Sequence, residues 1–244
     1  MTTPSKAGLA LLSAGAAKGL VEALAPRWNE PPWRARFGAV GAMQEALDDG
    51  APCDVLIVTD AMAAALEVSG KLRPGSRRPL GSVSTGVAVA AGAAAPSIVD
   101  GDALKRALLG ASALYFPDGE RSTAGAHFVA VLRRLGIHDQ VMGRLRMFAS
   151  GAVAMSALAE SGDAAAIGCT QVTEILYTSG VTLAGSLPEG YELKTIYSAG
   201  IARDGADLFA AQRFIDMLTG AGSLALRQAG GFEAPTRNFR QEKT

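Results

Sequence analysis

The chain has 244 residues, of which 49% are hydrophobic, so it can bury a substantial core in one large domain or two small lobes. Its 23 basic and 23 acidic side chains cancel, and no basic stripe carries interleaved aromatic residues, which argues against nucleic acid as a partner. No apolar run approaches the length that spans a bilayer, so no membrane partner is expected.

The first apolar, strand-like run ends at Ser13 and passes directly into a segment with helical spacing. At such a junction, unpaired backbone N–H groups and the positive end of the helix dipole can hold an anion. Ser13 is therefore the first candidate ligand-binding residue, with a simple helix cap as the alternative.

The first part of the chain alternates between two kinds of segment. Strands are predicted at 9–13, 33–39 and 54–60, and helices at 17–28, 40–50 and 61–70. This order predicts a βαβαβ unit whose mostly parallel sheet is covered by helices on both faces.

The same alternation restarts beyond residue 100, which predicts a second unit of the same architecture. Its helices are predicted at 103–111, 124–136 and 152–162, and its strands at 113–117, 144–149 and the start of 165–176. A strand at 193–202 follows, then two amphipathic helices within 207–232 and a frayed polar tail from Pro235.

The two units are joined without a proline-rich or serine-rich linker. We therefore expect the chain to cross between two lobes through extended strands near 82–91 and 193–201. Lobe one would comprise residues 1–83 and 198–244, and lobe two residues 84–197. A ligand cleft is expected between them, where strand ends meet helix N-termini.

Polar residues mark two further predicted helix starts. Ser122 and Thr123 stand in a glycine-bearing turn that lets the backbone approach a ligand closely, although either residue also suits a plain helix cap. Glu174 follows Gln171 by three residues, so a helix beginning there places both on one face. Glu174 is thus a candidate general base or an exposed helical acid.

Three side chains are candidates to carry a proton: His127, Glu174 and Tyr197. His127 lies in the first turns of a predicted helix, where the dipole favours a neutral imidazole that can accept a proton; the alternative is a packing or capping histidine. Tyr197 lies in the second crossing and either presents its hydroxyl to the cleft or is a buried strand tyrosine.

Metal and cofactor signals are absent from the sequence. Cys53 and Cys169 each stand alone beside an apolar run, which favours small buried thiols over a disulfide, a metal site or a nucleophile. No motif requires a metal ion or an organic cofactor.

Several segments together resemble the molybdate-binding-protein branch of the type II periplasmic solute-binding proteins. They include "LLSAGAAKGLVEALA", "FGAVGAMQEALDDGAPCDVLIVTDAMAAAL", "STAGAHFVAVLRRLG" and "ASGAVAMSALAESGDAAAIGCTQVTEIL". The resemblance extends from about Leu9 to about Phe232. It implies the periplasmic-binding-protein type II fold, in which two α/β lobes are joined by two crossing strands.

In that branch, the resemblance implies an oxyanion site made of hydroxyls and backbone N–H groups at helix N-termini. The serine of the first loop corresponds to Ser13. The serine of the second loop falls at Val40, where only the backbone N–H groups of Val40 and Gly41 remain.

The third and fourth contacts of the branch fall at Ala124 and Ala152, and its tyrosine falls at Gln171. Two side-chain hydroxyls are therefore missing, which weakens the case for molybdate or tungstate. Backbone donors together with Ser13, Thr123 and Gln171 would instead suit a small carboxylic acid.

The branch includes aconitate-isomerase-like members, so we expect an isomerase that moves a proton and double bond in a small unsaturated carboxylic acid. Because the N-terminus carries no typical signal peptide, a cytoplasmic location is expected. The alternative is the substrate-binding receptor of a molybdate-type ABC transporter, which would be periplasmic after removal of a leader. The expected partner is a small-molecule anion, and the oligomeric state is left open.

Overall fold

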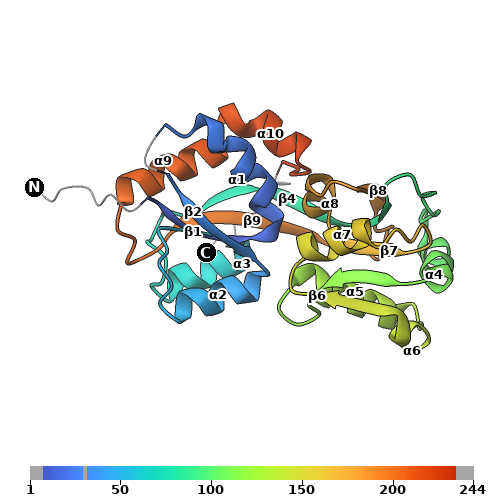
Figure 1. Cartoon of the computed structure of the whole chain (residues 1–244). Helices are drawn as coiled ribbons and strands as arrows, with labels where there is room; N and C mark the ends of the chain where they lie inside the picture. Colours follow the sequence, from blue (N-terminus) through green and yellow to red (C-terminus); the bar gives the residue numbers. More distant parts are fainter. Residues whose placement is uncertain (1–7, 30–31, 235–244) are drawn as a thin grey trace, which may run out of the picture.

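Two α/β lobes lie side by side in the computed structural model, which describes residues 8–29 and 32–234 (Figure 1). Lobe one begins with a parallel βαβαβ unit, as predicted, because strand β1 pairs with both β2 and β3. Its elements are β1 (Ala10–Ala14), α1 (Lys18–Leu24), β2 (Arg34–Gly38), α2 (Val40–Asp48), β3 (Val55–Thr59) and α3 (Asp60–Val68).

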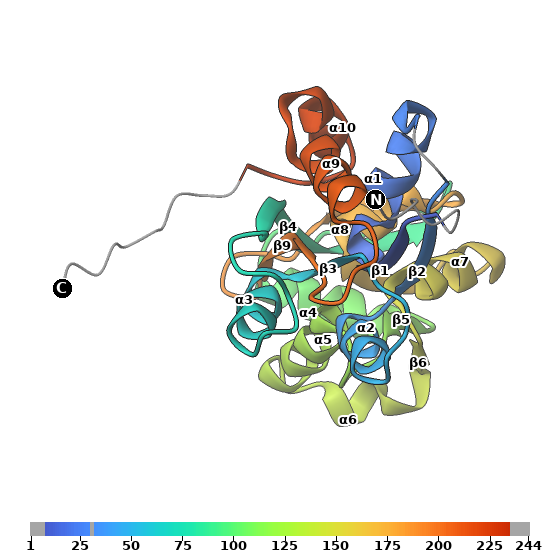
Figure 2. The same cartoon turned by 90° about the vertical axis from the view of Figure 1, so that its left-hand side faces the viewer.

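Helices cover both faces of the sheet of lobe one. Two helices near the C-terminus, α9 (Leu208–Thr219) and α10 (Leu224–Ala229), return to this lobe and lie with α1 on one face. Helices α2 and α3 cover the opposite face, as Figure 2 also shows. The expected pair of amphipathic helices within 207–232 is confirmed, and the tail from Pro235 lies outside the described residues.

Lobe two repeats the architecture with a shorter sheet. Its elements are α4 (Gly101–Gly110), β5 (Leu114–Pro117), α5 (Thr123–Arg134), α6 (His138–Val141), β6 (Leu145–Phe148), α7 (Gly151–Glu160), β7 (Ile167–Gln171), α8 (Val172–Tyr177) and β8 (Val181–Ser186). Short 3-10 turns occupy Gly15–Ala17, Ala25–Arg27, Met142–Arg144 and Ala221–Ser223. Strand β8 and helix α6 were not predicted, since the sequence there is short and rich in glycine or polar residues.

One nine-stranded sheet runs through both lobes in the order β2-β1-β3-β9-β4-β7-β5-β6, with β8 paired to β4. The 13-residue strand β4 (Arg78–Ala90) is the physical link, because its first half pairs with β9 (Lys194–Ile201) and its second half with β7 and β8. The change occurs between Ser84, which lies opposite Lys194, and Thr85, which lies opposite Gln171.

Two expectations about the sheet need correction. The sheet is not mostly parallel, because β3–β9, β4–β9, β4–β7 and β4–β8 are antiparallel pairs. Parallel neighbours need a long crossover connection, whereas β4 and β9 carry the chain straight from one lobe to the other. The second change of lobe also lies nearer Leu193 than Tyr197, since β9 pairs within lobe one from Lys194 onward.

Each lobe has its own hydrophobic core. In lobe one, the fully buried Phe214 packs edge-on against Trp28, with ring centroids 5.3 Å apart. In lobe two, Phe128 packs against Phe116 at the same centroid distance of 5.3 Å.

Both cysteines are free, as predicted, and burial raises the pKa of Cys53 to about 12. Within the described ranges, none of the helices has the length and apolar character needed to cross a membrane.

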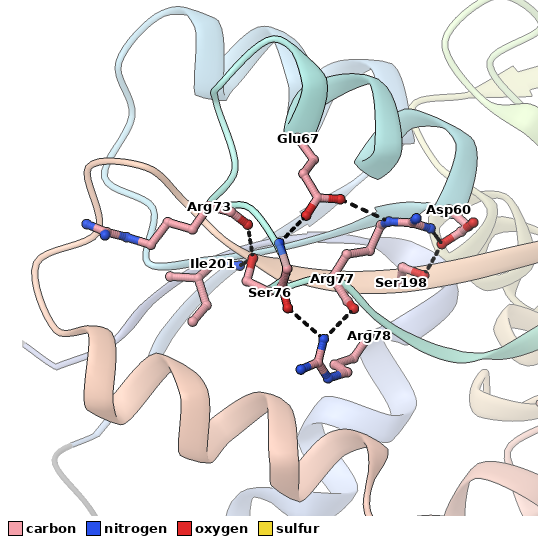
Figure 3. Close-up of polar contacts among 9 residues, drawn as sticks. Asp60, Glu67, Arg73, Ser76, Arg77, Arg78, Ser198 and Ile201 are labelled. Atoms are coloured by element: carbon pink, nitrogen blue, oxygen red, sulfur yellow. Dashed lines mark hydrogen bonds and ion pairs between the residues drawn. The ribbon is translucent and has the colours of Figure 1, made fainter.

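A polar network ties the start of β4 to helix α3 and strand β9 (Figure 3). The guanidinium of Arg77 lies 2.5 Å from Asp60 Oδ1 and 3.4 Å from Glu67 Oε2. The Ser198 hydroxyl donates to Asp60 at 2.6 Å. Asp60 therefore serves the packing of lobe one.

Replacing Arg77 by methionine is expected to lower the free energy of unfolding by about 1–2 kcal/mol, because two half-buried carboxylates lose their charged donor. Urea unfolding of wild type and variant measures the change. Arg78→Met is the matched control, since among the described residues the Arg78 side chain donates only to the Gly75 and Arg77 carbonyls. Equal losses in both variants would contradict a special role for the Arg77 ion pairs.

Candidate functional site

A small pocket lies where the two lobes meet. It is lined by the loops after β1 and β2, the starts of α5 and α7, and the junction of β7 with α8, together with a side chain of β9. The lining residues are Ala14, Gly15, Ala16, Gly38, Ala39, Val40, Ser122, Thr123, Gly151, Gln171, Glu174 and Tyr197. Its free volume is about 10 Å³, so the described conformation is closed around these residues.

The two loops that lobe one contributes to the lining, 14–16 and 38–40, have no side-chain hydrogen-bond donor, because they contain only alanine, glycine and valine. The Tyr197 hydroxyl, on β9, is the side-chain donor that lobe one adds to the described lining. Ser13 is fully buried one residue before the lining, and its hydroxyl donates to the Ala14 carbonyl at 3.1 Å. The structure therefore does not bring the predicted Ser13 hydroxyl into the pocket, because β1 extends through Ala14 and the lining loop starts after Ser13.

The loop after β2 meets lobe two directly. Val40 lines the pocket as expected, but the Gly41 N–H donates to the Arg121 carbonyl at 3.1 Å and is not free for a ligand. Arg121 also pairs with Glu45 of α2, with Nε 3.3 Å from Oε1. These contacts hold the two lobes together at the rim of the pocket.

The start of α5 contributes hydroxyl groups from lobe two. Ser122 caps the helix, its Oγ accepting from the Gly125 N–H at 3.3 Å, and it lines the pocket together with Thr123. The cap alternative for Ser122 is confirmed, and its contact with a ligand stays a prediction. Ala124, the next residue, is buried in the helix and is not part of the lining.

Glu174 is the central polar residue of the pocket. Its carboxylate accepts a hydrogen bond from the Thr170 hydroxyl at 2.6 Å. The backbone N–H groups of Ala152, Gln171 and Gly151 also donate to it, and each lowers the pKa of Glu174 less than the Thr170 hydroxyl does. Burial raises the pKa of Glu174, although these donors oppose the rise. The predicted exposed helical acid is excluded, because Glu174 is only 6% exposed.

Gln171 and Tyr197 complete the pocket beside Glu174. Gln171 is 2% exposed, and within the described part of the chain its amide nitrogen and oxygen have no hydrogen-bond partner of normal geometry. Tyr197 extends from β9, and burial raises the pKa of its hydroxyl, as does the nearby Glu174 carboxylate, while the Gln171 side chain lowers it. Buried polar atoms normally have partners, so the Gln171 amide is positioned for a ligand.

His127 lies away from these residues. Its Nε2 is 2.8 Å from the Tyr191 carbonyl, in the segment between β8 and β9. This contact supports the packing alternative for His127. Because His127 is not part of the pocket lining, it is not placed to carry the proton. The helix dipole argument placed it in the correct turn of α5 but could not fix which face it occupies.

Sequence reasoning missed Thr170 and the two glycines that make room for Glu174. A Cβ atom at Gly15 or Gly151 would collide with the Glu174 carboxylate, and one at Gly151 would also collide with the Thr170 hydroxyl. Ala152, predicted as the ligand contact of the fourth loop, is not part of the lining, and its backbone N–H acts on the Glu174 carboxylate. The four-residue spacing from Thr170 to Glu174 across a strand end was the available signal.

The raised pKa of Glu174 has a consequence for stability. The folded protein retains this proton to higher pH than the unfolded chain, so its stabilising contribution is complete below about pH 4.3 and is lost as pH rises through the folded pKa. We expect Glu174→Gln, which does not titrate, to gain stability relative to wild type as pH rises from 4.5 to 8. Urea unfolding across this range measures it, and a constant difference between the two proteins would contradict it.

Comparison with known proteins identifies relatives over most of the chain. Residues 9–233 match the family described as bacterial extracellular solute-binding protein. An aconitate isomerase from Pseudomonas sp. is 26% identical over 202 residues, which cover 79% of this chain and 75% of that protein. No group of three or more potential metal ligands occurs among the described residues.

Solved structures share the fold. The periplasmic molybdate-binding protein of Azotobacter vinelandii superimposes with a TM-score of 0.77 at 22% identity, covering 93% of this chain and all of that one. The sulfate-binding protein SubI of Mycobacterium tuberculosis gives a TM-score of 0.69 at 18% identity, covering 93% of this chain and 87% of that one. The expected molybdate-binding-like type II periplasmic binding fold is confirmed.

Proposed function

Because the chain belongs to the bacterial extracellular solute-binding proteins, we propose that its cleft binds a small unsaturated carboxylic acid and isomerises it by proton transfer through Glu174. The observation that carries this proposal is the buried Glu174 carboxylate, which lines the pocket between the lobes. An inert anion receptor gains nothing from a second negative charge at its binding position. A general base requires such a group.

The chemistry needs one proton and no net redox change. The Glu174 carboxylate takes a proton from a carbon next to the double bond, and the electron pair of the broken C–H bond moves into the conjugated carboxylate system. Backbone N–H groups at the α5 start, beside Ser122 and Thr123 of the lining, stabilise the developing enolate-like charge, because those at the α7 start already act on Glu174. Glu174 then returns the proton to another carbon, which shifts the double bond.

The neighbouring side chains suit the positioning of such a ligand. The Gln171 amide, which has no hydrogen-bond partner of normal geometry among the described residues, offers both a donor and an acceptor, and the Thr123 and Tyr197 hydroxyls lie in the same lining. The relative named aconitate isomerase supports the substrate class by analogy. Because only about 10 Å³ is free, the lobes must separate to admit a substrate.

The test uses purified protein with cis- and trans-aconitate and a panel of other unsaturated di- and tricarboxylates in deuterated water. Proton NMR is expected to show the isomer of the true substrate or deuterium on its carbon. A panel member that binds in a thermal-shift assay but is recovered unchanged and undeuterated would refute catalysis. That outcome would favour the alternative, a receptor for an oxyanion or carboxylate transporter. The cytoplasmic location stays a prediction, which fractionation of the native organism tests.

A further inference from the structure

Glu174 lies inside the pocket between the two lobes. Its carboxylate lies between Gly15 of lobe one and Gly151 at the start of α7, and it accepts the Thr170 hydroxyl at 2.6 Å. The free volume of about 10 Å³ would hold at most one water molecule. In the closed protein, the Glu174 side chain therefore takes up the space that a ligand would need.

No cationic side chain balances this carboxylate at the pocket. The lining in the described residues contains no lysine, arginine or histidine. Of the nearby cations, Arg121 pairs with Glu45 at the rim, and Lys18 lies over the Tyr177 ring, 5.3 Å from its centroid. A second full negative charge placed beside Glu174 would meet uncompensated repulsion.

The Gln171 amide is independent evidence of the ligand's chemistry. Its side chain is buried, and both its donor and its acceptor lack partners of normal geometry among the described residues. The buried Gln171 oxygen needs a hydrogen-bond donor. A tetrahedral dianion such as molybdate or sulfate has only acceptors, whereas a carboxylic acid can bring a proton.

We propose, as an extension of the proposed function, that Glu174 is the specificity-determining residue that excludes fully ionised tetrahedral oxyanions from this site. A carboxylic ligand is admitted because it and Glu174 share one proton, as two neighbouring carboxyl groups do when both cannot ionise together. The missing hydroxyls on the lobe-one loops weaken oxyanion binding, but the resident carboxylate prevents it.

The test compares wild type, Glu174→Ala and Glu174→Gln at pH 8 with sodium molybdate and sodium sulfate as probes, using thermal shift and calorimetry. Wild type is expected to bind neither anion. Glu174→Ala, which removes both the charge and the volume, is expected to bind at least one of them at least tenfold more tightly than wild type. Glu174→Gln removes the charge alone and is expected to show a smaller gain. Glu160→Gln, at an exposed position of α7, is the control and should behave as wild type.

Two results would overturn the assignment: wild type binding molybdate or sulfate as tightly as Glu174→Ala, or no gain in either variant. If Glu174→Ala does not fold, the glutamine variant alone decides. The outcome is separable from catalysis. If the variants gain oxyanion binding but wild type shows no deuterium exchange, the specificity role is retained and the isomerase is refuted. If wild type exchanges deuterium but neither variant gains oxyanion binding, the isomerase is retained and the specificity role is refuted.

Discussion

Replacing Glu174 by glutamine is expected to lower the rate of isomerisation on the order of a hundredfold or more, while the substrate still binds. Glutamine keeps the shape of the side chain and its acceptor oxygen toward Thr170, but it cannot take up or return a proton at the substrate carbon. The measurement is the initial rate of deuterium incorporation or isomer formation by NMR, with affinity determined separately by calorimetry.

The matched control is again Glu160→Gln, which makes the same chemical change on the exposed surface of α7. Its rate should equal that of wild type. A Glu174→Gln protein that retains more than a tenth of the wild-type rate would exclude Glu174 as the proton carrier. Tyr197 would then be the remaining titratable side chain in the described lining, and Tyr197→Phe would test it.

The order of elements was predictable because lobe one and lobe two alternate apolar runs of two different periods. Strand β3 and helix α3, for example, follow directly from "DVLIVTDAMAAALEV". The direction of the central strands was not predictable from such patterns. Whether β4 pairs in parallel or antiparallel fashion depends on partners far along the chain, such as Lys194 and Gln171.

The site was predictable to the level of loops, but less well for side chains. Val40, Thr123, Gln171, Glu174 and Tyr197 all reach the pocket, since strand ends and helix starts meet there. Whether a given side chain reaches the pocket depends on where the strand ends, to within one residue, and on which face of the helix the side chain occupies. For this reason the Ser13 hydroxyl bonds the Ala14 carbonyl, and His127 contacts the Tyr191 carbonyl, away from the pocket.

Gly151 shows how closely the backbone of α7 approaches the proposed proton carrier. In Gly151→Ala, the added Cβ would collide with Glu174 Oε2 and Thr170 Oγ1, so the hydrogen bond between these side chains must break or shift. We expect turnover to fall about a hundredfold, because a displacement of about 1 Å can cost that much. Overpacking should also lower the free energy of unfolding by about 1–3 kcal/mol.

Gly110→Ala is the matched control, because it places the same methyl group in helix α4, where no described atom beyond the chain neighbours and the helix's own backbone lies within 4 Å of the new Cβ. It should leave turnover unchanged and raise stability slightly. A double-mutant cycle identifies the cause of the loss: in a Glu174→Ala background the carboxylate that Gly151→Ala displaces is gone, so the stability penalty of the second substitution should shrink. An undiminished penalty would mean that the α7 backbone, and not the position of Glu174, requires glycine at residue 151.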